Sequence, residues 1–136
     1  MSDDFYMTHG YAESARRVAC IDFDGTLYER RPLYQQPDPL PGAVEAMRRL
    51  RASGYRIVIF TSRLSPAWLA ETHYTRSDQL DLIESVLRRD DIPFDEVTSD
   101  KPPAEVYVDD RAIRFAPGDW PAIIDWILWS GDGAGR

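Results

Sequence analysis

The sequence predicts an α/β fold: a Rossmann-like three-layer sandwich around a mostly parallel central sheet, formed by one domain over residues 1–136. Three observations support this prediction. Short continuous apolar runs, which are typical of strands covered on both faces, alternate with segments of helical spacing. Polar residues follow directly where several of these runs end. The length of 136 residues and the 43% hydrophobic content fit one domain with one core.

The first strand is predicted at 18–23, where Val18-Ala19-Cys20-Ile21 forms an apolar run. Asp22 and Asp24 follow two residues apart, so in extended backbone their side chains leave the same side. Gly25 then allows a sharp turn. Two carboxylates held close together repel each other unless a metal ion or a proton offsets their charge. This stretch is therefore the first candidate for chemistry.

The elements that follow can be assigned in order up to residue 60. Residues 1–15 are expected to form a loose arm. The proline-rich segment 27–40 is expected to be a loop or flap, with Tyr28 and Tyr34 as its anchors. Pro41-Gly42 predicts the start of a helix that ends at Gly54. The apolar run that ends at Phe60 predicts a second strand at 55–60.

The second half of the chain continues the alternation of helices and strands. Ser65 is predicted to cap a short helix, Ser77 a longer helix that stops before Pro93, and Asp119 a final helix over 120–129. The side chains of the final helix expected to face inward are Ile123, Ile124, Ile127 and Leu128. Further strands are predicted at 94–97, 105–108 and 113–115, and residues 131–136 form a tail.

Polar side chains gather where the predicted parallel strands end, which is where open α/β sheets bind ligands. The first strand ends in Asp22 and Asp24, the second in Thr61-Ser62-Arg63, and the fourth follows Lys101 and ends in Asp109-Asp110. A carboxylate can act as a covalent nucleophile, and oxygen ligands hold hard divalent cations. Hydroxyl and ammonium groups stabilise phosphoryl oxygens. The set therefore suits phosphoryl transfer.

On these residues the chain resembles the haloacid dehalogenase-like superfamily of phosphohydrolases, over about residues 18–129. Asp22-Phe23-Asp24-Gly25-Thr26 is similar to the first motif of that family, Thr61 to the second, Lys101 to the third and Asp109-Asp110 to the fourth. The chain departs from the family where Arg111-Ala112-Ile113-Arg114 follows the fourth motif, since a further acid often stands there.

This resemblance implies a role for each matched residue. Asp22 would be the nucleophile that forms an aspartyl-phosphate, and Asp24 the general acid and then the base for water. Thr61 and Lys101 would bind the transferring phosphoryl group, with Gly25, Ser62 and Arg63 as further substrate contacts. Mg²⁺ would be held by Asp22, by the backbone carbonyl of Asp24 and by Asp110, with Asp109 orienting Asp110 or binding through water.

The predicted elements leave no room for a separate cap domain, either between Thr26 and Pro41 or between Thr61 and Lys101. The site would then be open unless the 27–40 segment or a second subunit closes it, so a homo-oligomer is one expectation. The candidates for contacts with the leaving group are Arg30, Arg31, Tyr34, Arg63 and Trp68.

Several alternatives stay open from the residues alone. Ser62-Arg63 and Val108-Asp109-Asp110-Arg111 resemble the phosphatase domain of phage-type polynucleotide kinase-phosphatases. Half of a calcium loop is disfavoured because a third acid at EF-hand spacing is missing. A receiver-like signalling domain is disfavoured because Asp24 could hydrolyse the intermediate, and the same residue disfavours dehalogenation. A non-catalytic phosphate-binding domain on the same scaffold is the remaining alternative.

The composition limits the classes of partner and the cellular location that we expect for this protein. The net charge of −7 disfavours nucleic acid as a general partner, although a terminal phosphate remains an alternative substrate. No apolar run approaches the roughly 20 residues that a membrane helix needs, and the acidic N-terminus lacks a secretory pattern, so a cytoplasmic protein is expected. Lys101 is the only lysine, which suggests a position that requires a compact ammonium group.

Overall fold

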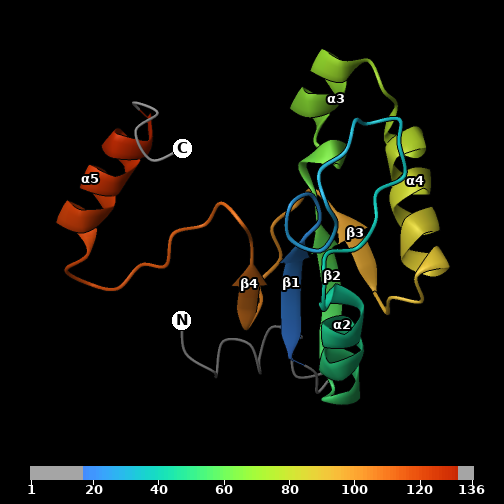
Figure 1. The fold of residues 1–136 in the computed structure, drawn as a ribbon, viewed down its shortest axis with the longest axis horizontal. Coiled ribbons are helices and arrows are strands. Elements are labelled where there is room, and N and C mark those ends of the chain that lie inside the picture. Colours follow the sequence, from blue (N-terminus) through green and yellow to red (C-terminus); the bar gives the residue numbers. More distant parts are fainter. Residues whose placement is uncertain (1–16, 132–136) are drawn as a thin grey trace.

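The computed structural model describes residues 17–131. The predicted N-terminal arm (1–15) and nearly all of the predicted tail (131–136) lie outside this range. The described chain contains a sheet of four strands that are all parallel, in the order β3-β2-β1-β4 (Figure 1). The strands are β1 (Val18–Asp22), β2 (Arg56–Phe60), β3 (Glu96–Thr98) and β4 (Val106–Val108). The predicted Rossmann-like α/β class is confirmed.

Two helices cover one face of this sheet, namely α2 (Ala43–Ala52) and α4 (Arg76–Arg89). The crossovers from β1 to β2 and from β2 to β3 run in the same direction, and right-handed crossovers then place both helices on one side. The core bears this out, because alternate residues of β1 and β2 are buried together with residues of both helices: Ala19, Ile21, Ile57, Ile59, Met47, Ile83, Val86 and Leu87.

Local chemistry explains most of the element boundaries. The 3-10 turn η2 (Ser62–Leu64) and the helix α3 (Pro66–Thr72) follow β2. Ser65 caps α3 as predicted, because its Oγ accepts a hydrogen bond from the Trp68 amide at 3.2 Å. The prediction for α4 is wrong by two residues, because Thr75 and not Ser77 is its N-cap. The third strand begins at Glu96, two residues later than predicted, and ends at Thr98.

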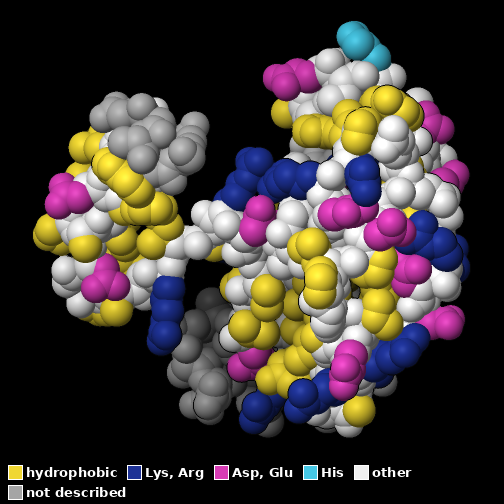
Figure 2. Space-filling view, in the orientation of Figure 1, with side chains coloured by type: hydrophobic (Ala, Val, Ile, Leu, Met, Phe, Trp, Pro, Cys, Tyr) yellow, Lys and Arg dark blue, Asp and Glu magenta, His cyan; other side chains and the backbone are white. Residues whose placement is uncertain are grey.

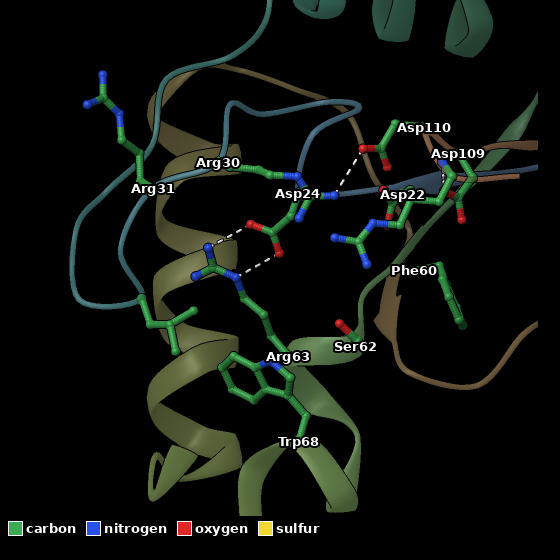
Figure 3. A pocket seen from close by; sticks show the side chains of 12 residues that line it. Asp22, Asp24, Arg30, Arg31, Phe60, Ser62, Arg63, Trp68, Asp109 and Asp110 are labelled. Atoms are coloured by element: carbon green, nitrogen blue, oxygen red, sulfur yellow. Dashed lines mark hydrogen bonds and ion pairs between the residues drawn. The ribbon is translucent and has the colours of Figure 1, made fainter. Parts of the chain in front are cut away.

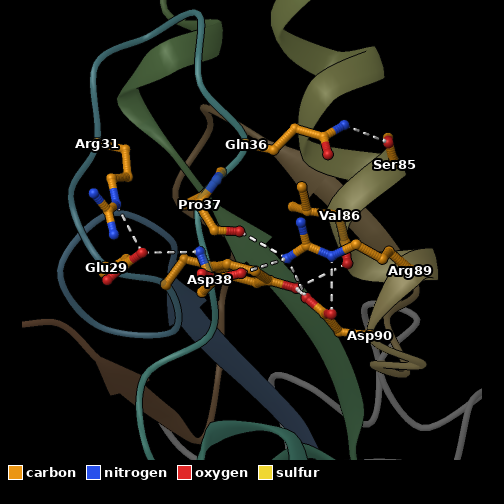
Figure 4. A network of polar contacts seen from close by, with 10 residues as sticks. Glu29, Arg31, Gln36, Pro37, Asp38, Ser85, Val86, Arg89 and Asp90 are labelled. Atoms are coloured by element: carbon orange, nitrogen blue, oxygen red, sulfur yellow. Dashed lines mark hydrogen bonds and ion pairs between the residues drawn. The ribbon is translucent and has the colours of Figure 1, made fainter.

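The segment 27–40 is an irregular loop tied to α4, with no element assigned within it (Figure 4). Tyr28 is fully buried, stacks on Phe23 at a centroid distance of 4.8 Å and donates its hydroxyl to Asp90 and to the Val86 carbonyl. Arg89 donates to the Pro37 carbonyl at 2.7 Å. The prediction for Tyr28 is confirmed, whereas Tyr34, the other expected anchor, is 72% exposed.

The C-terminal helix α5 (Trp120–Gly131) stands away from the sheet, at the end of the extended stretch that follows β4 (Figure 1). The expected fifth strand at 113–115 is absent from the described chain. The prediction that the apolar face of the helix points inward is also wrong, because none of the residues of α5 in the described range is buried. Within residues 17–131, no helix is long and apolar enough to cross a membrane.

Candidate functional site

Three carboxylates meet at the carboxyl edge of the sheet. Asp22 ends β1, and Asp109 and Asp110 directly follow β4, which pairs with β1 in parallel. Ile21 and Val108 are register partners, so the acids that follow them are level. One oxygen from each of the three carboxylates lies within 4.8 Å of the others (Figure 3). Carboxylate oxygens are the ligands that hard cations prefer, so the cluster could hold a metal ion.

The turn after β1 links the acids of the two strands. The Thr26 hydroxyl lies 3.0 Å from an Asp22 carboxylate oxygen and accepts a hydrogen bond from the Asp110 amide at 2.9 Å. Gly25 has a φ of +82°, and a Cβ at that position would lie 2.5 Å from the Asp110 carboxylate. A residue with a side chain would therefore displace Asp110 as well as strain the backbone. Gly25 and Thr26 are thus required by the geometry of the acidic cluster.

The electrostatics of the cluster separate Asp22 from Asp110. Burial raises the pKa of Asp22 to about 6; the Thr26 hydroxyl opposes this shift, and the nearby Asp109 and Asp110 add to it. Partial burial also acts to raise the pKa of Asp110, but hydrogen bonds from Arg30 and with Asp22 lower it below its ordinary value. Arg30 Nη2 lies 3.0 Å from Asp110 Oδ2. A cation beside Asp22 would remove much of the cost of ionising it.

A cavity of about 430 Å³ opens beside the three acids. Its wall is rich in arginine, with one tryptophan at the side formed by α3 (Figure 3). Among the predicted leaving-group contacts, Tyr34 does not line this cavity, and Thr61 is also missing from its wall. The lining residues are Asp22, Asp24, Arg30, Arg31, Leu33, Phe60, Ser62, Arg63, Trp68, Asp109, Asp110 and Arg111.

Asp24 faces the cavity but belongs to a different ion pair. Arg63 Nε and Nη2 donate to its two carboxylate oxygens at 2.9 and 2.7 Å. The Arg63 side chain is 1% exposed, donates a further hydrogen bond to Gln79 and stands over the Phe23 ring. The Asp24 carboxylate is outside the group of three that could share a metal ion. Arg63 thus fixes the position of Asp24.

The other predicted site residues lie near the acids in different ways. Thr61 is buried, and its hydroxyl oxygen accepts a hydrogen bond from the Arg63 amide at 3.2 Å, so it caps the turn η2. Ser62 is exposed on the cavity wall. Lys101 lines a second cavity of about 270 Å³ that Asp22 and Asp109 also border. Its ammonium group lies 4.6 Å from the centroid of the Tyr107 ring.

Three interactions of the site were not foreseen from the sequence. These are the pairing of Arg63 with Asp24, the hydrogen bond from Arg63 to Gln79, and the pairing of Arg30 with Asp110. The partners stand 16 to 80 residues apart, and no spacing rule connects them. Of the residues in these three interactions, only Arg63 could have been singled out from the sequence. It lies just beyond the end of β2, so it was expected at the same edge of the sheet as the acids that follow β1.

Comparisons with known proteins agree with this fold. A conserved protein from Bacteroides thetaiotaomicron is 25% identical, with a TM-score of 0.50 over 85% of this chain and 92% of its own. A structural-genomics target from Vibrio cholerae is 26% identical, with a TM-score of 0.53 over 84% of this chain and 98% of its own. No family model and no curated protein matches the chain. Neither structure carries a named activity, so function must be argued from the site.

Proposed function

We propose that this protein is a Mg²⁺-dependent phosphatase that hydrolyses a phosphomonoester through an aspartyl-phosphate on Asp22. The observation that carries the proposal is the convergence of Asp22, Asp109 and Asp110 within 4.8 Å at the mouth of an arginine-rich cavity. The resemblance of the strand-end residues to haloacid dehalogenase-like phosphohydrolases supports it.

In the first step, an Asp22 carboxylate oxygen attacks phosphorus, and the bond from phosphorus to the ester oxygen breaks. The departing alkoxide takes a proton from Asp24, which releases the alcohol. In the second step, water attacks the phosphorus of the acyl phosphate and gives a proton back to Asp24. The phosphorus–oxygen bond to Asp22 then breaks, and inorganic phosphate leaves with both carboxylates restored.

The pairing of Arg63 with Asp24 shapes this proton transfer. Both Asp24 oxygens accept from the guanidinium, yet each oxygen keeps a further lone pair that can hold a proton. The pair fixes the carboxylate at the cavity wall, where it would face a bound ester.

The donor set fits Mg²⁺. Asp22 and Asp110 would hold the ion through carboxylate oxygens, with Asp109 beside them, and the bound cation would offset the charge gathered on the phosphoryl oxygens. Lys101 adds a positive charge on the second cavity that Asp22 borders. Ser62 and the arginines of the larger cavity are placed for contacts with the substrate.

The test is phosphate release, with and without Mg²⁺, from a panel of phosphorylated metabolites and of oligonucleotides with 5′ or 3′ terminal phosphate. We expect Mg²⁺-dependent turnover of at least one class by the wild type and a loss of about three orders of magnitude or more in Asp22→Asn. Beryllium fluoride, an analogue of the acyl phosphate, should bind the wild type and not Asp22→Asn.

The matched control is Asp81→Asn, which makes the same change at an exposed carboxylate on α4. It should retain wild-type turnover. Full activity in Asp22→Asn would refute the covalent mechanism, and equal turnover in Asp24→Asn would refute the acid–base role of Asp24. If no phosphate ester in the panel is hydrolysed while Mg²⁺ still binds, the outcome favours a non-catalytic phosphate-binding domain over a phosphatase.

A further inference from the structure

The helix α5 is apolar on nearly all sides and yet exposed. Of the side chains in Trp120–Gly131, only Asp125 is charged. The rings of Trp126 and Trp129 pack at a tilt, with centroids 4.9 Å apart, and remain 48% and 46% exposed, and Leu128 is 61% exposed. Figure 2 shows apolar side chains spread over the visible face of this helix. A helix that is hydrophobic all round is normally buried, and twelve residues alone form only a marginal helix in water.

The segment before α5 makes its contacts with the start of that helix. Residues 112–116 belong to no helix or strand. They end in a turn in which the Ala116 amide donates to Asp119 Oδ2 at 2.8 Å and the Asp119 amide donates to the Ala116 carbonyl. Phe115 packs on Trp120 with ring centroids 5.3 Å apart. Residues 112–131 therefore form an ordered arm that carries the apolar helix outward from β4.

An apolar groove lies on the body of the protein between α2 and the edge strand β4. Val106 and Val108 pair with Ala19 and Ile21, so they point to the same face of the sheet as the α2 side. Both valines remain about 40% exposed, because α2 does not reach over β4. A cavity of about 250 Å³ opens there, lined by Ile21, Thr26, Leu27, Pro41, Gly42, Ala43, Ala46, Met47 and Val108. Small side chains on α2 leave room for a second helix.

We propose that α5 docks in the α2–β4 groove of a second copy of this chain, and that the two copies exchange their arms reciprocally. The exchange covers both unpartnered apolar surfaces of each copy at once. It places a third helix beside α2 and α4 on the same face of the sheet. The arm can keep the course that carries α5 away from its own sheet (Figure 1), whereas docking in the groove of its own chain would require α5 to return to that sheet.

The available area suits a stable dimer. An aromatic side chain can bury about 150–250 Å², so three half-exposed tryptophans offer roughly 300 Å² per copy. The aliphatic residues of α5, together with Val106 and Val108, enlarge this surface in both copies. Two such contacts related by symmetry exceed the about 1,000 Å² that marks a specific interface. Each copy makes the same contact with the other, so the assembly is complete as a dimer and does not grow further.

Light scattering coupled to size-exclusion chromatography of the full chain tests the proposal. We expect twice the monomer mass for the wild type. Ala46→Glu places a charge in the groove at an exposed helix position and should give a monomer. The matched control is Ala52→Glu, the same substitution at an exposed position of α2 outside the groove, which should remain a dimer. The double variant Trp126→Glu/Trp129→Glu should also be monomeric.

Mixing the two monomeric variants distinguishes exchange from direct pairing of the α5 helices. Ala46→Glu retains a normal arm, and the double tryptophan variant retains a normal groove. Reciprocal exchange therefore predicts that the mixture, unlike either variant alone, forms a dimer with one intact contact at high protein concentration, more weakly than the wild type because half of the interface is lost. A monomeric wild type would overturn the proposal in favour of an arm that folds back. A dimeric Ala46→Glu, or a mixture that stays monomeric, would overturn the α2–β4 groove as the docking site.

Discussion

Asp22 combines partial burial with two neighbouring acids, and this combination raises its pKa to about 6. Below pH 3.8 the carboxyl is protonated in both the folded and the unfolded protein. Between pH 3.8 and about 6 only the folded protein retains the proton, so the free energy of unfolding falls as the pH rises through this window. Above about pH 6 the Asp22 carboxyl is ionised in both states, and the free energy of unfolding is lowered by the full cost of burying this anion.

Asp22→Asn should therefore stabilise the metal-free protein at pH 8, because the amide removes the charge without changing the shape. We expect a gain of about 1 kcal/mol in the free energy of unfolding, after allowance for the partial exposure of the carboxylate. At pH 4 the gain should be much smaller. Urea denaturation in the presence of a chelator measures both values. Asp81→Asn should change neither, and an equal gain at both pH values would contradict this account.

The pairing of Arg63 with Asp24 makes an asymmetric prediction. Arg63 is 1% exposed and Asp24 22% exposed, so removing the carboxylate leaves a buried cation without its partner. Asp24→Ala should cost about 3 kcal/mol of stability, whereas Arg63→Met, which leaves a partly hydrated anion, should cost about 1–2 kcal/mol. Denaturant unfolding of both variants without metal ranks the two costs. The reverse order would show that the Arg63 guanidinium is satisfied by other groups, such as Gln79, without Asp24.

Residue positions were predictable from the sequence where the backbone alone decides them. Asp22, Asp109 and Asp110 meet because parallel strands end at one edge, and the apolar runs before them mark those strands. The partners of Arg63 and Arg30 were not predictable, because side chains that meet across 39 and 80 residues follow no periodicity. The burial of Thr61 depends on a 3-10 turn that its own hydroxyl caps.

At the scale of elements, the loop 27–40 owes its shape to α4. Tyr28 donates to the Val86 carbonyl at 2.9 Å and to Asp90 at 2.7 Å, while Arg89 holds the Pro37 carbonyl (Figure 4). Burial, followed by the hydrogen bond to Asp90, raises the pKa of the Tyr28 phenol above its ordinary range, so the group stays a donor. The loop carries Arg30 and Arg31 to the cavity, and its attachment to α4 therefore places two cavity side chains.

Tyr28→Phe should loosen this attachment without disturbing the core. The ring still packs on Phe23, but the loss of the buried hydroxyl should cost about 1–2 kcal/mol of stability. Amide hydrogen exchange should increase in residues 29–38 more than in β1 or β2. Tyr34→Phe is the matched control, since Tyr34 lies in the same loop and is mostly exposed. Equal exchange in the two variants would show that other contacts hold the loop.

Element boundaries in the sequence were predictable to within about two residues, because caps and apolar runs mark them. The exception at this scale is the stretch 113–115, whose alternating apolar residues predicted a strand. A strand needs a neighbour to pair with, and the direction of the chain after β4 gives it none in the described structure. The pattern of α5 likewise predicted a helix, but an apolar pattern does not specify which chain covers it.

At the scale of the whole molecule, the proposed exchange of arms would make stability depend on protein concentration. If two copies exchange α5, folding and association are coupled, and the thermal midpoint should rise as the protein is concentrated. A tenfold increase in concentration should raise it by a few degrees, measured by differential scanning calorimetry. Trp126→Glu/Trp129→Glu should melt at one temperature throughout. A wild-type midpoint that ignores concentration would show that the chain folds as an independent monomer.

Lys101 is a position at which the site can be labelled selectively. It is the only lysine of the chain, it is exposed, and its cavity borders both Asp22 and Asp109. An amine-selective reagent will therefore modify a single side chain besides the N-terminal amine. A dye attached there would stand next to the acids, so its emission would report events at the carboxyl edge of the sheet without any engineered cysteine. The natural sequence thus provides one lysine for attaching a reporter group beside the site.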